Sequence, residues 1–263
     1  MKRLENKVAI VTASITGIGQ ACVRKLAEHG ATVYLAAHLK EESIEVVNLL
    51  RNENLNVKYV YFDAFDSTTH TAMIKNVIRE EGKIDILVNN FGTTDVNKDF
   101  DLINGDTEAF FKIVRVNLES VYLTSKAVIP HMIKRGGGSI INISSIGSIV
   151  PDISRLAYSV SKSAINSLTQ NIAVQYAKQG VRCNAIMPGM TATPAVEASL
   201  NDEFKKVFLS NVPMGRMAEP EDIANAVLYY ASDESSFVTG MLHNMAGGFG
   251  LVTPLYSDFI GSK

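Results

Sequence analysis

Cysteine is scarce in this sequence, and there is no excess of positive charge. The two cysteines, Cys22 and Cys183, lie far apart, each within a segment of regular pattern. We therefore expect reduced thiols with a packing role, as in a cytoplasmic protein. Lys and Arg number 25 against 27 Asp and Glu, which gives a net charge of -2. No basic field attracts a nucleic acid or an anionic membrane, so neither partner is expected.

Long apolar runs and metal-ligand clusters are also missing. The charged segment 1–7 leads into an apolar run that ends at Ala13, which is too short and too poorly flanked for a signal peptide. No apolar stretch approaches the length of a membrane span. The five histidines show no ligand spacing, so we predict no metal site. These absences favour a cytoplasmic location.

What the chain does contain is a regular alternation of apolar runs and helical patterns. Its 263 residues allow one large α/β domain or two small ones, and no repeat, linker or composition break divides them. Strands are expected at 7–13, 32–37, 57–62, 84–88, 139–143, 182–187 and 241–244, and the main helices between them at 20–30, 41–52, 67–80, 106–134, 152–180 and 220–231. The pattern predicts a single-domain, doubly wound Rossmann α/β fold over 1–263, with a seven-stranded parallel sheet and helices on both faces.

The first strand is followed at once by a glycine-containing turn and a helix. The turn holds Ser14, Thr16, Gly17 and Gly19. A helix N-terminus offers unpaired N–H groups to a phosphate, and glycine lets the backbone approach it closely. With the strand at 32–37, this segment is typical of a dinucleotide-binding unit.

The end of the second strand bears on the choice of cofactor. An NAD-selective unit usually has an acidic residue there, whereas this chain has Ala37 followed by His38. Histidine is only partly charged at neutral pH, and the turn contributes Thr16 in place of a basic residue. The sequence therefore favours NADP(H) modestly and leaves NAD(H) possible.

Tyr158 and Lys162 are four residues apart, so in a helix they share one face. A cation beside a phenol favours the phenolate and lowers the phenol pKa, and such a pair could exchange a proton with an alcohol. The other interpretation is a half-buried ring beside a solvated charge. Taken alone, the pair favours the second interpretation.

Two segments near the C-terminus are open to two interpretations each. The segment 190–211 is rich in Ala, Met and Phe and could be a lid over an apolar site or a surface helix. The tail 249–263 contains Phe249, Leu251, Tyr256 and Phe259. We expect this tail to pack on its own chain or on a partner.

The accumulated motifs resemble the short-chain dehydrogenase/reductase family over essentially the whole chain. The family's Thr-Gly-x-x-x-Gly-x-Gly turn stands here as residues 12–19, with Ala13 in place of the first glycine, and we expect Ala13 to be accommodated at negative φ. The Asn-Asn-Ala-Gly motif stands as residues 89–92, with Phe91 in place of alanine. Ser145 lies thirteen residues before Tyr158, which is the family spacing, and Lys162 completes Tyr-x-x-x-Lys.

The resemblance implies a residue-by-residue assignment of the site. The implied catalytic residues are Asn117, Ser145, Tyr158 and Lys162. The implied cofactor-binding residues are Ala13, Ser14, Thr16, Gly17, Ile18, Gly19, His38, Asp63, Ala64, Asn90, Gly92, Tyr158, Lys162, Pro188, Gly189, Thr191 and Thr193. In these roles Ser145 binds the reacting oxygen, Tyr158 exchanges the proton, and Lys162 lowers the phenol pKa and holds the nicotinamide ribose. Asn117 anchors a water that relays the proton. The family likeness also suggests a homotetramer.

A closer likeness, in residues 151–155 and 163–170 and in Pro254 and Tyr256 of the tail, is to bacterial 7-alpha-hydroxysteroid dehydrogenases that act on bile acids. It implies a steroid substrate. The alternatives are a reductase of a 3-oxoacyl thioester, a steroid enzyme acting at another position, a non-catalytic nucleotide sensor and an oligomeric structural protein. The sequence has no obvious basic cluster near 190–211 for an acidic acyl carrier.

Overall fold

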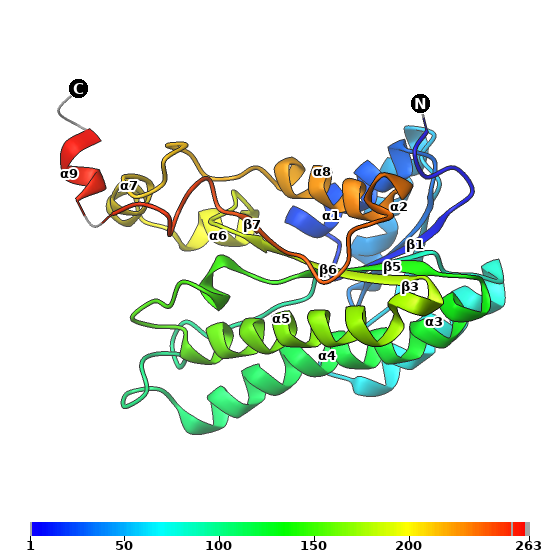
Figure 1. Cartoon of the computed structure of the whole chain (residues 1–263), viewed down its shortest axis with the longest axis horizontal. Helices are drawn as coiled ribbons and strands as arrows, with labels where there is room; N and C mark the ends of the chain where they lie inside the picture. Colours follow the sequence, from blue (N-terminus) through cyan, green and yellow to red (C-terminus); the bar gives the residue numbers. More distant parts are fainter. Residues whose placement is uncertain (1, 254, 261–263) are drawn as a thin grey trace.

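The computed structural model describes residues 2–253 and 255–260. A seven-stranded parallel sheet runs through it in the order β3-β2-β1-β4-β5-β6-β7 (Figure 1). The strands are β1 Val8–Thr12, β2 Thr32–Ala37, β3 Val57–Tyr61, β4 Ile86–Asn89, β5 Gly138–Ile143, β6 Val181–Pro188 and β7 Leu242–Met245. The strand order reverses between β1 and β4, which is where an open α/β sheet forms a ligand crevice. The predicted doubly wound fold is confirmed.

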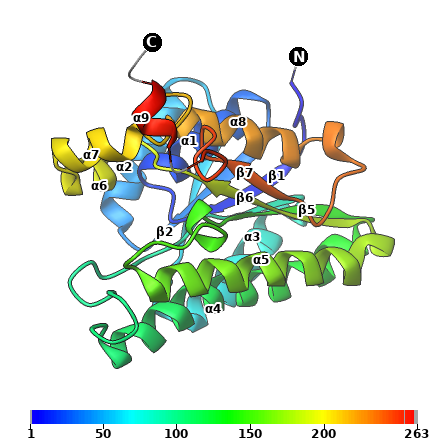
Figure 2. The ribbon, with the colours of Figure 1, turned by 60° about the vertical axis from the view of Figure 1, so that its left-hand side comes forward.

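Helices cover both faces of the sheet (Figures 1 and 2). One face carries α1 Gly17–Glu28, α2 Lys40–Asn52 and α8 Pro220–Ala231, and the other carries α3 Ser67–Glu81, α4 Thr107–Lys134 and α5 Leu156–Tyr176. Right-handed crossovers place α1 and α2 on one face while the sheet grows from β1 to β3, and the reversal of direction from β3 to β4 sends α3, α4 and α5 to the other face. The central strands are therefore buried on both sides, as their continuous apolar runs predict.

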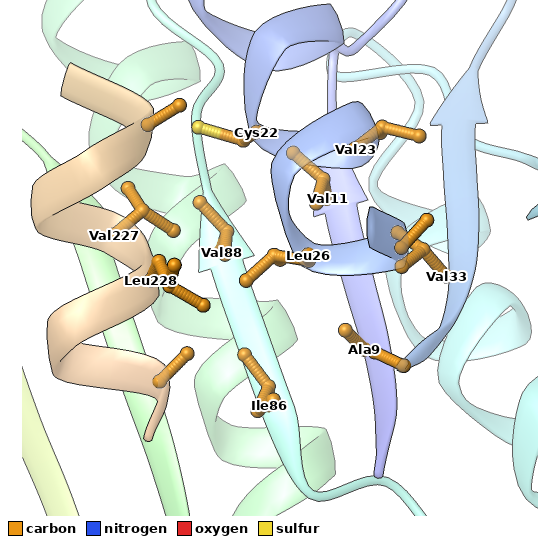
Figure 3. Packing of buried hydrophobic residues seen from close by; sticks show 14 of the residues in the cluster. Ala9, Val11, Cys22, Val23, Leu26, Val33, Ile86, Val88, Val227 and Leu228 are labelled. Atoms are coloured by element: carbon orange, nitrogen blue, oxygen red, sulfur yellow. The ribbon is translucent and has the colours of Figure 1, made fainter. Parts of the chain in front are cut away.

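The core between α1, α8 and the sheet is shown in Figure 3. Leu26 and Cys22 of α1 point toward Val227 and Leu228 of α8 and toward Val88 of β4, and these side chains belong to one buried cluster. Truncating a fully buried leucine such as Leu26 to alanine would cost about 2–5 kcal/mol. This packing fixes the N-terminal end of α1 relative to the sheet.

The opposite face has its own buried cluster, which includes Met73 of α3, Val128 of α4, Ile172 of α5 and Cys183 of β6. Helices α4 and α5 run side by side along this face (Figures 1 and 2). Both helices begin at the end of the sheet where the strands terminate. Residues at their first turns are thereby brought to the crevice.

Short elements gather at the carboxyl end of the sheet. They are the 3-10 turn η1 Ile146–Ser148 and helices α6 Pro194–Ser199, α7 Asp202–Leu209 and α9 Tyr256–Ile260, while η2 Ala177–Gln179 and η3 Asp233–Ser235 lie elsewhere. The segment 190–211 thus contains two helices, because Thr193 caps α6 and Asn201 caps α7. Helix α9 was not expected from the sequence.

The C-terminal tail packs on its own chain through the ring of Phe249. The ring of Phe249 stacks on that of Phe208 of α7 at 4.8 Å between centroids, and Phe208 in turn stacks on Phe204 at 6.3 Å. Leu251 remains 79% exposed. Pro254, residues 261–263 and the side chain of Phe259 lie outside the described residues. In the part of the chain that is described, no helix combines the length and the apolar character needed to cross a membrane.

Candidate active site

The turn after β1 differs from the expectation in its backbone. Ala13 has φ of +51°, in the left-handed region, so the expectation of a negative φ is wrong. A residue with a Cβ pays about 1–2 kcal/mol there, which explains why glycine suits the position. Such strain persists only where the surroundings fix the backbone.

Asn90 fixes that backbone. Its Nδ2 donates to the carbonyls of Ala13 at 2.9 Å and Thr12 at 3.1 Å, and its own N–H donates to the Thr12 hydroxyl at 3.0 Å. Ser14 Oγ donates to the Val11 carbonyl at 2.7 Å. These bonds tie the ends of β1 and β4 together. Asn90 therefore supports the turn in addition to lying at the predicted cofactor site.

The turn and the start of α1 form a cradle that fits a dinucleotide pyrophosphate. A Cβ on Gly19 would lie 2.6 Å from the Ser14 Cα, so this backbone passes too close for any side chain. Gly17 opens α1 at φ of +56°, and a Cβ there would lie 3.0 Å from Thr193 Cγ2. The first N–H groups of α1, including that of Ile18, have no carbonyl one turn earlier in the helix. They are suited to phosphate oxygens.

Two strand ends beside this cradle hold the residues predicted for the adenine and ribose side. His38 is exposed directly after β2, and Asp63 and Ala64 follow the neighbouring β3. Asp63 Oδ1 accepts from the Phe65 N–H at 2.9 Å. Burial is the main cause that raises the pKa of Tyr59, and the charges of Tyr61 and Glu41 add to it. The Tyr59 hydroxyl donates to the Ala37 carbonyl. Glu41 itself lies in the first turn of α2, three residues after His38.

Ser145 and Tyr158 meet in front of the crevice. Tyr158 is half-buried in the first turn of α5. Burial raises the pKa of its phenol, while a side-chain hydrogen bond with Ser145 and the charge of Arg155 oppose the rise. Ser145 Oγ also accepts from the Gly147 N–H at 3.1 Å, which fixes the serine at the start of η1. The pKa of Tyr158 is therefore raised on balance, because desolvation exceeds the opposing effects. The sequence analysis expected this pKa to be lowered.

Lys162 lies one helical turn beyond Tyr158 and is 2% exposed. Its Nζ donates to the Ile143 carbonyl at 2.8 Å and the Phe91 carbonyl at 3.4 Å, and lies 5.6 Å from the centroid of the Tyr158 ring. Burial lowers its pKa to about 8. A Cβ on Gly92 would lie 2.6 Å from Nζ, so a side chain at this position would displace the ammonium. The interpretation as a solvated lysine is excluded.

Asn117 projects from the middle of α4 and is fully buried. Its Oδ1 accepts from the Thr93 N–H at 2.9 Å, and its Nδ2 donates to the Thr93 carbonyl at 2.9 Å and Ser161 Oγ at 3.0 Å. The side chain thus joins the loop after β4 to α5. These bonds engage both ends of the amide, and the Asn117 main-chain carbonyl accepts from the Ser120 hydroxyl at 3.0 Å.

Known proteins resemble this chain in sequence over nearly its full length. Residues 12–250 match the sequence family described as Enoyl-(Acyl carrier protein) reductase. The chain is 58% identical to a 7alpha-hydroxysteroid dehydrogenase of Clostridium sardiniense over 98% of this chain and 99% of the relative. It is 52% identical to a 7alpha-hydroxysteroid dehydrogenase of Paraclostridium sordellii, over 100% of this chain and 99% of the relative. The chain belongs to the short-chain dehydrogenase/reductase family.

Two solved structures are similar throughout. One, a 7 alpha-hydroxysteroid dehydrogenase complexed with NADH and 7-oxo glycochenodeoxycholic acid, superposes with a TM-score of 0.89 at 30% identity, covering 94% of this chain and 95% of that one. The other is a gluconate 5-dehydrogenase from Burkholderia cenocepacia in complex with NADP and tartrate. It superposes with a TM-score of 0.90 at 30% identity, covering 95% of this chain and 98% of that one. As a family member, the chain is an NAD(P)-dependent oxidoreductase.

The family assignment places the remaining predicted residues at the end of β6. Pro188 closes β6 and Gly189 follows, where a Cβ would lie 2.8 Å from the Ala246 Cα. Thr191 is buried and donates to the Gly189 carbonyl at 3.1 Å, and Thr193 Oγ1 caps α6 by accepting from the Val196 N–H. Through Gly17, Thr193 connects the segment 190–211 to the cradle. These assignments stay predictions.

Two polar groups lie close to the site, of which the sequence analysis named Asn89 and missed Asp99. Asn89, the last residue of β4, bonds to Asn142 at 2.9 Å and to Thr124 at 2.7 Å inside the molecule. It belongs to a buried network and does not face the crevice residues. Asp99, in the loop after β4, bonds to the first turn of α5. An isolated Asp in a loop gives no sequence signal for such a contact.

Proposed function

We propose that this enzyme transfers a hydride reversibly between a nicotinamide cofactor and the 7-alpha-hydroxyl of bile acids. The observation that carries the proposal is whole-chain identity of 58% and 52% to two 7alpha-hydroxysteroid dehydrogenases. At this identity, with Ser145, Tyr158 and Lys162 in place, conservation of the reaction is the simplest inference. The proposal extends the substrate named for those relatives to this chain.

The surroundings of Tyr158 support an apolar substrate. Ile149 and Ile153, in the loop before α5, are exposed, with Ile153 90% exposed, and Leu251 of the tail is exposed as well. A Cβ on Gly250 would lie 2.7 Å from Val150 Cγ2, so tail and loop are in contact. Exposed apolar side chains grouped beside a polar site are typical of a surface that binds an apolar ligand. We infer that residues 190–211 cover this surface as a lid.

In the proposed mechanism Ser145 binds the reacting oxygen and Tyr158 exchanges the proton. The raised pKa keeps Tyr158 protonated at neutral pH, which is the form that donates to a ketone oxygen. In the other direction the alcohol O–H gives its proton to the phenolate as the C–H hydride leaves. Alcohol oxidation should therefore accelerate as the pH rises. The nicotinamide, when bound, supplies or accepts the hydride.

Lys162 and the cradle hold the cofactor in this proposal. The Lys162 ammonium would bond to the nicotinamide ribose and favour the phenolate of Tyr158. The first turn of α1 would bind the pyrophosphate through Gly17, Ile18 and Gly19, with Ser14 and Thr16 beside them. Asn117 would hold the loop and a relayed water.

The cofactor preference is proposed as NADP(H) over NAD(H). His38 after β2 leaves room for a 2′-phosphate, in keeping with the absence of an acidic side chain at that position of the sequence. Glu41 in the next helix makes the preference modest, because its charge opposes a phosphate. Both cofactors are therefore expected to function.

A reductase acting on an acyl thioester is the main rival, since the matching family carries that description. Helix α7 argues against an acidic carrier protein there. Lys205 and Lys206 are balanced on it by Asp202 and Glu203. No net positive surface results on that helix. A steroid substrate needs no such charge.

Assembly and location complete the proposal. We propose a homotetramer, supported by an exposed apolar row on α4 and α5 that includes Phe111 and Tyr122. A cytoplasmic location is proposed as well. Cys22 and Cys183 are free and buried, which is compatible with a reducing compartment.

The decisive experiment compares NADP and NAD with 7-alpha- and 7-beta-hydroxy bile acids and an acetoacetyl thioester. We expect turnover of the 7-alpha-hydroxy compounds, faster with NADP. A folded Tyr158→Phe variant should bind the cofactor normally and lose at least about 100-fold in kcat. Preference for the thioester, or wild-type turnover by Tyr158→Phe, would contradict the proposal.

A further inference from the structure

Helix α5 begins without a cap of its own. Its N-cap residue, Arg155, has φ of 60° and ψ of 41°, and within the described residues its side chain makes no cap hydrogen bond. The first N–H groups of a helix have no partner one turn earlier, and burying them unpaired is unfavourable. Tyr158 lies in this first turn. The end of the helix that carries the tyrosine therefore depends on groups from elsewhere in the chain.

Asp99 supplies those groups from the loop between β4 and α4. Its Oδ1 accepts from the Ala157 N–H at 2.7 Å, and its Oδ2 accepts from the Tyr158 N–H at 3.0 Å. The Thr94 hydroxyl donates to Oδ2 at 2.8 Å, and the Asp99 carbonyl accepts from the Arg155 N–H at 2.9 Å. The carboxylate is 5% exposed. Charge-assisted bonds of this kind are about twice as strong as neutral ones, and the helix dipole adds to them.

The other end of the same loop is fixed from α4. Asn117 binds both backbone groups of Thr93 and reaches Ser161, which lies one turn after Tyr158. The loop 93–99 is therefore bonded to α5 directly at Asp99 and through Asn117 of α4 at Thr93. Of the two attachments, Asp99 is the one that contacts the backbone of Tyr158 itself.

We propose that Asp99 is a positioning residue for Tyr158, holding the first turn of α5 so that the phenol stays beside Ser145. The inference rests on the proposed catalytic role of Tyr158. Displacing a catalytic group by about 1 Å can reduce a rate about 100-fold. Asp99 touches no reacting atom, so its effect belongs to kcat and not to the binding of the cofactor.

Two variants remove the contact in steps. Asp99→Asn keeps one oxygen but presents an amide to one of the helix N–H groups, and Asp99→Ala removes both oxygens. We expect kcat per cofactor-binding site to fall about 10-fold in Asp99→Asn and about 100-fold in Asp99→Ala. KM for the cofactor should stay within about twofold of wild type in both variants. Amide hydrogen exchange at residues 156–160 should accelerate in the same order.

Asp106→Ala is the matched control, because Asp106 caps α4 through the Ala109 N–H at 2.7 Å. It should lower thermal stability and leave kcat unchanged. The inference is overturned if folded Asp99→Ala has wild-type kcat, or if Asp106→Ala loses as much. Tyr158→Phe is assayed alongside. If it is inactive while Asp99→Ala is fully active, only the positioning role fails, whereas an active Tyr158→Phe removes the proposed function together with this inference.

Discussion

Lys162 is a buried cation whose hydrogen-bond acceptors are two main-chain carbonyls, Ile143 and Phe91. Its pKa of about 8 lies below that of an exposed lysine, so between pH 8 and 10.5 the unfolded chain binds more protons than the folded one. Stability from this residue therefore rises with pH across that window, and burying the charge costs about 3 kcal/mol below it.

We predict that Lys162→Met is more stable than wild type at pH 7 and that the difference shrinks as the pH approaches 10. Urea unfolding of both proteins at several pH values measures the difference, in which the other titrating groups largely cancel. A difference that stays constant with pH would mean that the pKa of Lys162 is the same in the folded and the unfolded protein. Cofactor must be absent, since it binds only the folded state.

Ala13 gives a second prediction at this scale. Ala13→Gly relieves a left-handed alanine but adds entropy to the unfolded chain, so we expect a net gain of about 0–1 kcal/mol. The same change at the exposed helical Ala72 should lose about 1 kcal/mol. Chemical denaturation compares the two. An equal loss in the free energy of unfolding for both substitutions would mean that the Ala13 backbone is unstrained.

These residues also mark what sequence reasoning could reach. The pair Tyr158 and Lys162 was predictable, since helical spacing fixes their relation before any tertiary contact is known. The φ of Ala13 was not, because it is imposed by Asn90 from another strand. Asp99 was beyond reach for the same reason, as it lies 58 residues from Ala157 in the chain.

Among the elements, α7 is a weakly anchored helix beside the site. None of its residues is fully buried, and its fixed point is the stack of Phe208 on Phe249. Such a pair contributes about 0.5–1.5 kcal/mol beyond the area it buries. The proposed lid therefore depends on the tail.

Removing the stack tests that dependence. Phe249→Ala should raise KM for the steroid about 2–10-fold and leave cofactor affinity unchanged. Phe237→Ala is the control, because Phe237 is an aromatic residue fully exposed in the loop before β7. Steady-state kinetics with each substrate varied separately gives the answer. An unchanged KM in Phe249→Ala would show that α7 covers the site without the tail.

The boundaries of the short helices are set by capping side chains. The segment 190–211 was predictable as mobile or helical, but its division into α6 and α7 depends on the side-chain bonds of Thr193 and Asn201. Helix α9 escaped prediction because a five-residue element in an aromatic tail has no period to detect. The strands were the clearest elements because a doubly covered sheet demands continuous apolar runs.

At the scale of the whole molecule, α4 and α5 share an outward apolar face. Phe111, Tyr122 and Val174 are exposed on it, around a cavity of about 510 Å³ lined by both helices. An apolar strip along two long helices is suited to pairing with a second copy.

We predict that Phe111→Glu combined with Tyr122→Glu yields a smaller assembly than wild type. Light scattering coupled to gel filtration measures the mass. Leu102→Glu is the control, since Leu102 is also exposed but lies in the loop before α4. If the double variant keeps the wild-type mass, this face is not a subunit interface.

The two thiols described in the core have a practical consequence. Burial raises the pKa of Cys22 strongly and that of Cys183 to about 12, so at neutral pH both are protonated and shielded. Alkylating reagents and mild oxidants act on exposed thiolates, so the native enzyme should resist both. A single cysteine introduced at the exposed Val207 of α7 could then carry a fluorophore without removing the natural ones. The motion of the lid would be reported directly in the otherwise unaltered enzyme.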